Sequence, residues 1–314
     1  MAFHKRFRGR ARQLLAVVAL GATAFTLAAC GGGGGDPLSD SSSAPSASKV
    51  IVGSANFTES QVLGELYAQA MQAKGVQIET KPGIGSREVY IKALKDGSIS
   101  VVPEYTGNLL LYVDPEATAT TESVIMQALP AAIGEELKVL EPSQAQDQDV
   151  YVVTKQTAQQ HGIASLDDLK KISANSILGG PSELQDRAYG PPGLEKIYGA
   201  KFKQFKPYDA PAVKVKDLND NKIQVATFFT TEAAIRDNGY VMLTDPQSMI
   251  LPQNVIPLAR ADMATNTAAV EAINAVQKAL TTDELTALNK QVDSGQEEPH
   301  EAAAAWLKAK GLVS

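Results

Sequence analysis

Three segments of this chain combine aromatic, amide and charged side chains just after predicted strand ends. They read GSANFTE at residues 53–59, PEYTGN at 103–108, and QDR at 185–187 followed by GPPGL at 190–194. Free backbone N–H groups in the first turn suit an anion. Tyr105 offers a ring and Arg187 a positive charge. Taken singly, the three segments are equally typical of a capped turn, a rim tyrosine and a surface arginine.

Catalytic residues are hard to place in this sequence. Beyond the N-terminal segment the only histidines are His161 and His300, and both lie in polar surroundings typical of solvent-exposed helix positions. No H-E-x-x-H or G-x-S-x-G motif occurs, and the glycines at 83 and 85 precede no Walker lysine. We therefore expect no catalytic residue, no metal and no cofactor, and the chain is predicted not to be an enzyme.

Alternating strands and helices are expected to position the three segments. Apolar runs predict strands at 50–53, 76–80, 99–102, 151–154, 177–180, 223–229, 241–243 and 255–258. Helical spacing predicts helices at 59–74, 88–96, 165–171, 193–198, 232–237, 266–280, 282–291 and 300–310. This β-α-β order predicts an α/β protein with parallel sheets, whose ligand sites lie at the carboxyl ends of the strands.

The order of elements favours two lobes, each a central sheet flanked by helices. We expect the chain to cross between them near 147–150 and again near 245–253. One lobe then comprises residues 49–149 plus 250–314, and the other comprises 150–249. Paired crossings make a hinge, and the cleft between hinged lobes is a natural trap for a small solute.

The first fifty residues read as an export signal. A basic stretch without acidic residues precedes an apolar run at 14–26, which is too short to span a bilayer stably. The run ends in Leu27-Ala28-Ala29-Cys30, which resembles the bacterial lipobox, whose cysteine is lipidated after cleavage. Residues 1–29 are thus predicted to be a lipoprotein signal peptide, and 30–48 a lipidated Cys30 with a Gly/Ser/Ala/Pro tether.

Charge and cysteine usage narrow the class further. Cys30 is the only cysteine, so a disulfide or thiolate metal site in the folded part is excluded. Without residues 1–29 the chain carries 24 basic and 35 acidic residues, a formal balance of −11. Nucleic acid is therefore not an expected partner.

In their order and spacing, the three segments resemble the substrate-binding proteins of osmoprotectant ABC importers, the glycine betaine/choline-binding ProX and OpuBC/OpuCC type. The NFTE and EYTG motifs carry the resemblance, and the arginine before a PGL segment supports it. The resemblance extends over residues 49–314. It implies the two-lobed, type II periplasmic-binding-protein fold, which closes on its ligand by a hinge motion.

The resemblance also implies a ligand site. In this family aromatic faces hold a quaternary ammonium through cation–π attraction, and basic and hydroxyl groups hold a carboxylate. The residues of this chain that match, or lie beside, those positions are expected to bind the substrate. They are Tyr105, Asn108, Tyr151, Arg187, Phe229, Asn56, Phe57 and Gln253.

This chain departs from the family pattern at several of these positions. Ala55 replaces the usual lysine of the first turn, Asn108 replaces a threonine, and Phe229 stands where tyrosine is common. Gln253 falls where the last tyrosine of the aromatic cage is expected. Because a ring and a basic group are missing, we expect glycine betaine to bind weakly.

The sequence therefore predicts an extracytoplasmic, lipid-anchored and monomeric bacterial protein. It would capture an osmoprotectant-like solute for an ABC permease and its ATPase. Two alternatives keep the same fold: a neutral or aromatic ligand, or a solute-sensing lipoprotein that feeds no transporter. A third alternative is a secreted hydrolase or isomerase on a related scaffold. The absence of a plausible nucleophile–base pair in this sequence argues against it.

Overall fold

The computed structural model describes residues 49–314. The predicted signal peptide, the lipid-bearing Cys30 and the tether lie outside the described residues. Within the described part no helix is both long and apolar enough to traverse a bilayer.

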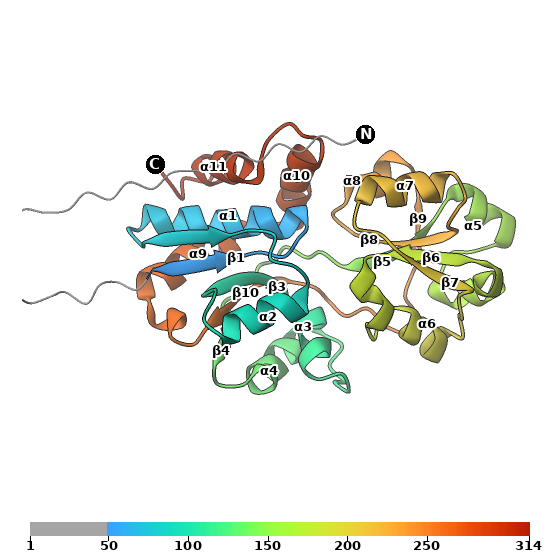
Figure 1. The fold of residues 1–314 in the computed structure, drawn as a ribbon, viewed down its shortest axis with the longest axis horizontal. Coiled ribbons are helices and arrows are strands. Elements are labelled where there is room, and N and C mark those ends of the chain that lie inside the picture. Colours follow the sequence, from blue (N-terminus) through green and yellow to red (C-terminus); the bar gives the residue numbers. More distant parts are fainter. Residues whose placement is uncertain (1–48) are drawn as a thin grey trace, which may run out of the picture. The chain divides into compact units, whose positions relative to one another are not determined.

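Two five-stranded sheets form the centre of the structure (Figure 1). The first has the order β2-β1-β3-β10-β4 and the second the order β7-β6-β8-β5-β9. The strands of the first sheet are β1 (Val50–Gly53), β2 (Ile78–Lys81), β3 (Val101–Tyr105), β4 (Leu137–Val139) and β10 (Val255–Arg260). Those of the second are β5 (Asp149–Val153), β6 (Ile177–Gly180), β7 (Gln204–Pro207), β8 (Val225–Phe229) and β9 (Val241–Met242).

The α-helices of the described residues divide between the same two parts of the chain. Those beside the first sheet are α1 (Thr58–Ala73), α2 (Arg87–Lys95), α3 (Thr106–Val113), α4 (Glu122–Ile133), α9 (Thr267–Ala279), α10 (Thr282–Asp293) and α11 (Pro299–Ala309). Those beside the second are α5 (Lys155–His161), α6 (Pro191–Tyr198), α7 (Pro211–Asn219) and α8 (Ala233–Asp237). Short 3₁₀ helices are η1 (Leu166–Lys171), η2 (Ser173–Asn175), η3 (Ser182–Asp186) and η4 (Met263–Thr265).

The strands fall into sheets as the two-lobe prediction requires. β1–β4 and β10 form the first lobe, whereas β5–β9 form the second. The chain passes from one sheet to the other between β4 and β5, and returns between β9 and β10. The residue boundaries of the lobes, at 149/150 and 249/250, stay a prediction.

The expectation of parallel sheets is wrong at two strands. β1 runs parallel to β2 and β3, and β6 runs parallel to β7 and β8. In contrast, β10 is antiparallel to β3 and β4, and β5 is antiparallel to β8 and β9. β5 and β10 are the first strands formed after each crossing, so each enters its sheet from the side of the other lobe.

The two crossing segments are themselves paired. Gln146 and Asn254 form an antiparallel bridge. The Asp147 N–H donates to the Gln253 carbonyl at 3.0 Å, and the Val255 N–H donates to the Ala145 carbonyl at 3.0 Å. The outgoing and returning chains therefore form a two-stranded ribbon where they leave the first lobe.

Alternation along the strands supplies the core on both faces of the first sheet. Val101 faces the cluster formed with α1, α9, α10 and α11, whereas its neighbour Val102 faces the cluster formed with α2, α3 and α4. Figure 1 shows α1 and α2 on opposite faces of this sheet. A strand covered on both faces requires apolar residues at successive positions, which explains its continuous apolar run.

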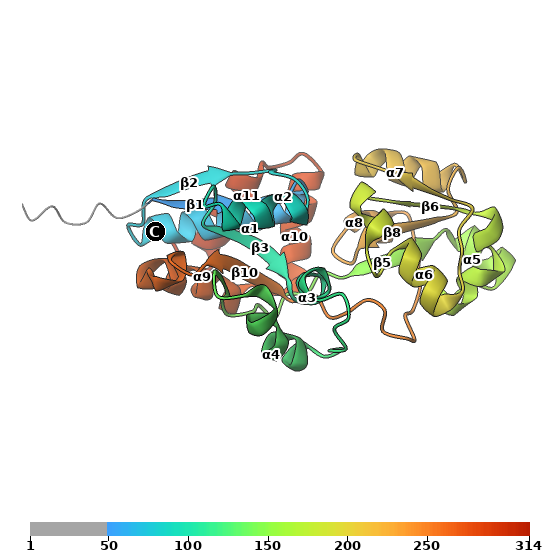
Figure 2. The same cartoon turned by 60° about the horizontal axis from the view of Figure 1, so that its bottom comes forward.

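The second sheet follows the same rule. Tyr151 and Val153 pack with α6 and η1, while Val150 and Val152 pack with α7 and α8. In Figure 2, α6 and α7 lie on opposite faces of the sheet. Each of the two lobes thus has two buried apolar layers of its own.

The predicted helices and strands are present with shifts of a few residues at their ends. Several elements were not predicted: α3, α4, α5, α7, β4 and β7. α3 matters for function because it begins at Thr106, inside the EYTG motif. The predicted strand at 99–102 in fact runs to Tyr105, so Tyr105 is the last residue before that helix.

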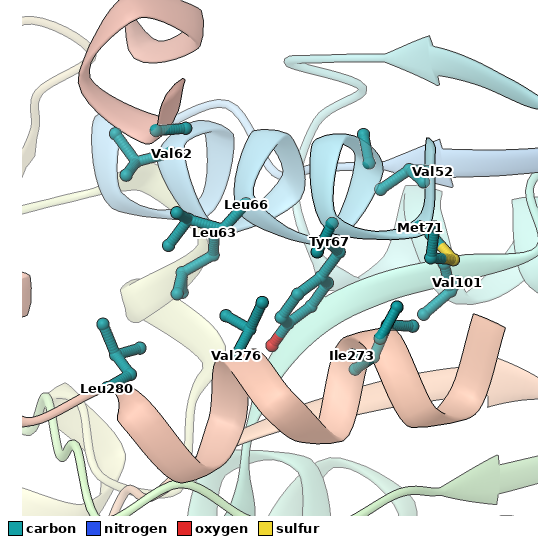
Figure 3. Close-up of a cluster of buried hydrophobic side chains, with 14 of the residues drawn as sticks. Val52, Val62, Leu63, Leu66, Tyr67, Met71, Val101, Ile273, Val276 and Leu280 are labelled. Carbon is teal, nitrogen blue, oxygen red and sulfur yellow. The ribbon is translucent and has the colours of Figure 1, made fainter. Parts of the chain in front are cut away.

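Helix α1 is the central helix of the first lobe. Leu63, Leu66 and Tyr67 are fully buried and point toward α9, where Ile273 and Val276 meet them (Figure 3). The Tyr67 hydroxyl donates to the Gln277 side chain at 3.0 Å, which satisfies it within this layer. The middle of α1 is thereby packed against α9, and the N-terminal end of the same helix carries the NFTE motif.

We predict that Leu66→Ala destabilises the folded chain by about 2–5 kcal/mol, because it leaves a cavity in a closely packed layer. Urea unfolding followed by circular dichroism measures the effect. Val213→Ala in α7 is the matched control, since Val213 is 51% exposed and surface truncations change stability by about 0.5 kcal/mol or less. Equal midpoints for the two variants would contradict this packing.

Candidate ligand cavity

A cavity of about 340 Å³ is lined by residues of both lobes. The first lobe contributes the turn before α1, the start of α2, the end of β3 and part of α10. The second lobe contributes the segment after β6 and the residues that follow β8. The cavity therefore lies at strand ends, where the β-α-β pattern led us to expect ligand sites.

Six of the eight predicted substrate-binding residues line this cavity. They are Asn56, Phe57, Tyr105, Asn108, Arg187 and Phe229. Segments separated by more than 170 positions in the sequence are thus brought to one site. Their contact with a ligand stays a prediction.

Three aromatic rings of this set form one cluster. The ring of Phe57 stacks on Tyr105 at a centroid distance of 6.3 Å and on Phe229 at 5.4 Å. Phe57 caps the start of α1, Tyr105 ends β3 and Phe229 ends β8. Phe57 therefore links the aromatic surfaces of the two lobes.

Tyr151 does not line the cavity, and its expected position there is corrected. The ring is fully buried in the core of the second lobe, and its hydroxyl donates to the Tyr189 carbonyl at 2.7 Å. The reason is its place along β5: Tyr151 is the third residue of the strand and packs within the sheet against α6. Asp149, two residues earlier at the start of this strand, lines the cavity instead.

Gln253 is also absent from the cavity wall, so the prediction that it replaces a cage tyrosine is wrong for this structure. Its side chain is fully buried. It accepts a hydrogen bond from the Asn108 N–H at 3.0 Å and donates to the Asn108 side-chain oxygen at 2.8 Å. Gln253 therefore orients Asn108, whose own amide donates to Asp149 at 2.7 Å.

Gly107 permits this arrangement. A Cβ at that position would lie 2.5 Å from the Cβ of Leu251 and 2.7 Å from the Pro252 carbonyl oxygen. Only glycine allows α3 to start so close to the returning chain. The glycine of the EYTG motif thus reflects close packing beside Asn108.

Arg187 lines the cavity but its charge is already paired. Its guanidinium lies 2.6 Å from Glu88 of the first lobe and 5.8 Å from the ring centre of Tyr112. Partial burial raises the pKa of Glu88, but hydrogen bonds from Arg187 and Ser86 outweigh it and lower that pKa to about 2. The Arg187 Nε has no partner among the described residues.

The other two basic groups of the wall are paired too. Arg87 donates twice to Glu104, at 2.8 Å from Nε and 2.8 Å from Nη2. Lys214 donates to the Thr227 carbonyl at 2.8 Å and lies 3.7 Å from Glu232. Such pairs hold buried charges at low net potential and leave little positive field for a ligand.

Sequence reasoning missed three acidic residues of the wall, Glu59, Asp147 and Asp149. All three are buried, and within residues 49–314 none has a basic side chain within 4.0 Å. Burial raises the pKa of each carboxyl, and hydrogen bonds offset this only in part. The excess charge of the cavity wall is therefore negative.

A sequence signal for two of them was available. Asp147 and Asp149 alternate just before an apolar strand, at the predicted first crossing. Alternate residues of an extended chain point to the same side, so this pair was a candidate for the cleft. Glu59 is harder to recognise, because an acidic residue in the first helical turn usually serves the helix dipole.

The arrangement suits binding rather than reaction. The described histidines, His161 and His300, do not line the cavity, and no group of His, Cys, Asp or Glu side chains in the described residues is placed to hold a metal ion. What the wall offers is ring faces, hydrogen-bond groups and negative charge.

Comparison with known proteins identifies the type of binder. Residues 48–309 match the family model described as the substrate binding domain of an ABC-type glycine betaine transport system. A glycine-betaine-binding protein of Pseudomonas aeruginosa is 24% identical over 277 residues, which cover 83% of this chain and 88% of that protein. The glycine betaine-binding protein YehZ of Escherichia coli is 25% identical over 279 residues, covering 84% and 92%.

A solved structure shows the same fold. The crystal structure titled glycine betaine/carnitine/choline ABC transporter has a TM-score of 0.66 and 22% sequence identity, covering 84% of this chain and all but 1% of the other. The fold is thus the two-lobed type II periplasmic-binding-protein fold that the sequence predicted. Because the family match spans most of its length, this chain belongs to the substrate-binding domains of ABC-type glycine betaine transport systems, which are solute-binding proteins and not enzymes.

Proposed function

We propose that this chain captures a quaternary ammonium solute in the cavity and delivers it to an ABC permease with its ATPase. In this proposal the protein is a monomer anchored outside the cytoplasm by lipid on Cys30. Family membership supports the transport role, and the cavity wall supports the class of ligand.

The observation that carries the ligand class is the pairing of ring faces with unpaired carboxyls. A quaternary ammonium donates no N–H hydrogen bond, so ring faces and nearby negative charge are what can stabilise it. Phe57, Tyr105 and Phe229 supply the faces. Glu59, Asp147 and Asp149 supply carboxyls without a basic partner, which can carry negative charge beside a bound cation.

The same wall is less suited to a neutral or aromatic solute, which was the alternative from sequence. Such a ligand brings no positive charge to the buried carboxyls, so each would have to stay protonated or remain as a costly buried charge. The cavity wall therefore supports a cation over a neutral molecule.

The expectation of weak glycine betaine binding now rests on different residues. Gln253 no longer supports it, because that side chain is not at the wall. Arg187 supports it, because a ligand carboxylate would have to compete with Glu88 for the guanidinium.

We expect choline, which carries no carboxylate, to bind more tightly than glycine betaine in titration calorimetry.

We predict that Phe229→Leu weakens choline binding by about 2- to 30-fold, because one cation–π face is lost while apolar volume is kept. Titration calorimetry measures the change. Phe202→Leu is the matched control, because Phe202 packs against the core of the second lobe and does not line the cavity. This variant should bind choline with the affinity of the unmodified protein.

A second control concerns the ligand. The neutral carbon isostere of choline has a tert-butyl group in place of trimethylammonium and nearly the same shape. It should bind far more weakly than choline to the unmodified protein. Equal affinities for the two molecules would refute recognition of a cation and favour a neutral solute.

The anchor is tested separately. We predict that Cys30→Ala moves the protein from the membrane fraction to the soluble fraction after a salt and carbonate wash, because no lipid is attached. Circular dichroism of the released protein should match that of residues 49–314 expressed alone. Retention of the variant in the membrane fraction would show that Cys30 is not the anchor.

A further inference from the structure

Glu59 is the most heavily hydrogen-bonded carboxyl of the cavity wall. It is 3% exposed. It accepts hydrogen bonds from the Tyr105 hydroxyl at 2.6 Å, the Thr231 hydroxyl at 2.8 Å and the Asn289 amide at 2.5 Å. Three donors directed at one carboxyl stabilise its ionised form.

Asp147 shares one of these partners. Its Oδ1 accepts from the Thr231 N–H at 3.0 Å and from the Thr230 hydroxyl at 3.2 Å. Thr231 therefore contacts both carboxyls, from its hydroxyl and from its backbone. Two carboxyls buried side by side repel each other when both are charged, so without a cation beside them one favours its protonated form. Asp147 accepts fewer and longer hydrogen bonds than Glu59, so its charged form is the less stabilised of the two.

The remaining groups around this pair supply no positive charge to it. Asp149 and Tyr105 add carboxyl and phenol groups, and α10 adds Asp293 and Asn289. Glu232 is close to Lys214, whose ammonium donates to the Thr227 carbonyl. Burial raises the pKa of Asp147 well above its usual range, and the neighbouring charge of Glu59 raises it further.

One more oxygen of this wall is unsatisfied. The side-chain oxygen of Asn289, a residue 5% exposed that lines the cavity, has no hydrogen-bond partner among the described residues. An orphaned buried acceptor beside a buried carboxylate leaves a site of negative potential. A bound cation is the group that would relieve it.

We propose that Asp147 is protonated in the ligand-free protein and releases its proton when a quaternary ammonium enters the cavity; this rests on the function proposed above. The Asp147 O–H bond breaks, its electron pair stays on the carboxylate, and the proton passes to the buffer. No covalent bond forms to the ligand, whose positive charge takes the place of the proton. Binding is thus an exchange of one cation for another.

The sign of the pH dependence follows. A bound cation favours the charged carboxylate, so the Asp147 pKa is lower in the complex than in the free protein. Between these two pKa values the affinity rises by about tenfold per pH unit, because each ligand bound releases about one proton. Below both values, and above both, the affinity is flat.

Choline is the probe for the test, because it has no group of its own that titrates near neutrality. Calorimetry at pH 7 in phosphate and in Tris separates the heat of binding from that of buffer protonation. The observed binding heats should differ between the two buffers. Divided by the difference in buffer protonation enthalpy, that difference gives the protons released, at most about one per choline bound. Affinity measured from pH 5 to pH 8 should rise with pH, by at most about tenfold per unit.

Two variants remove the exchange for opposite reasons. Asp147→Asn has no proton to release, and Glu59→Gln removes the charge that holds the proton on Asp147. Choline should bind to both with no difference between buffers. Asp237→Asn, an exposed carboxyl on α8, also removes one charge and should keep the full buffer dependence. Either variant suffices if the other fails to fold.

The outcomes separate this proposal from the broader one. Choline binding with equal heats in both buffers and a flat pH profile would overturn the proton exchange and leave the proposed function standing. No heat with choline, glycine betaine or carnitine would overturn both. Buffer dependence that survives in both Asp147→Asn and Glu59→Gln would assign the proton to another group.

Discussion

A single desolvated carboxylate, that of Glu59, determines how the ligand cavity is built. A charge taken out of water must be met by donors, and here the donors come from three separate parts of the chain. Tyr105 ends β3, Asn289 lies in α10 and Thr231 follows β8. The hydrogen bonds to Glu59 therefore hold the ends of two strands, one from each sheet, beside a C-terminal helix. The aromatic cluster depends on Glu59 too. Phe57 lies in the same turn as Glu59, and Tyr105 at the end of β3 is one of the donors to Glu59. An apolar side chain at position 59, which accepts no hydrogen bond, would remove the reason for the convergence.

The cavity wall differs from a simple aromatic cage because its basic groups are internally neutralised. Arg87 is paired with Glu104, and Arg187 with Glu88, whereas the acidic groups near Thr231 and Asn108 are met only by neutral donors. The net field is therefore that of the carboxyls. A wall with unpaired carboxyls discriminates strongly between cationic and anionic ligands, even when their shapes are similar. The reason is that a ligand charge of the wrong sign is strongly repelled in a low-dielectric site.

Much of the fold was readable from the sequence, because hydrophobic periodicity and turn residues act locally. The strand at 50–53 and the helix that follows it were located this way, whereas the six predicted residues that line the cavity came from the resemblance to a known family. What failed depends on register and on distant partners. Tyr151 was assigned to the cavity by its match to an aromatic position of the family. The structure begins β5 at Asp149, two residues before the predicted start, and Asp149 takes the cavity position. Gln253 was misjudged because its partner, Asn108, lies 145 positions away. The antiparallel direction of β5 and β10 likewise follows from the crossings, which no local pattern encodes.

The paired crossing segments have a mechanical consequence. Because Gln146 and Asn254 bridge, and hydrogen bonds flank that bridge, the two linkers bend together as a ribbon and not as independent tethers. A ribbon of two strands is stiff within its plane and compliant perpendicular to it. We therefore expect bending mainly across the plane of the ribbon and beyond its hydrogen-bonded part. A mutation that unpaired the ribbon would add a second direction of motion, so that the lobes could meet out of register and close without forming a cavity.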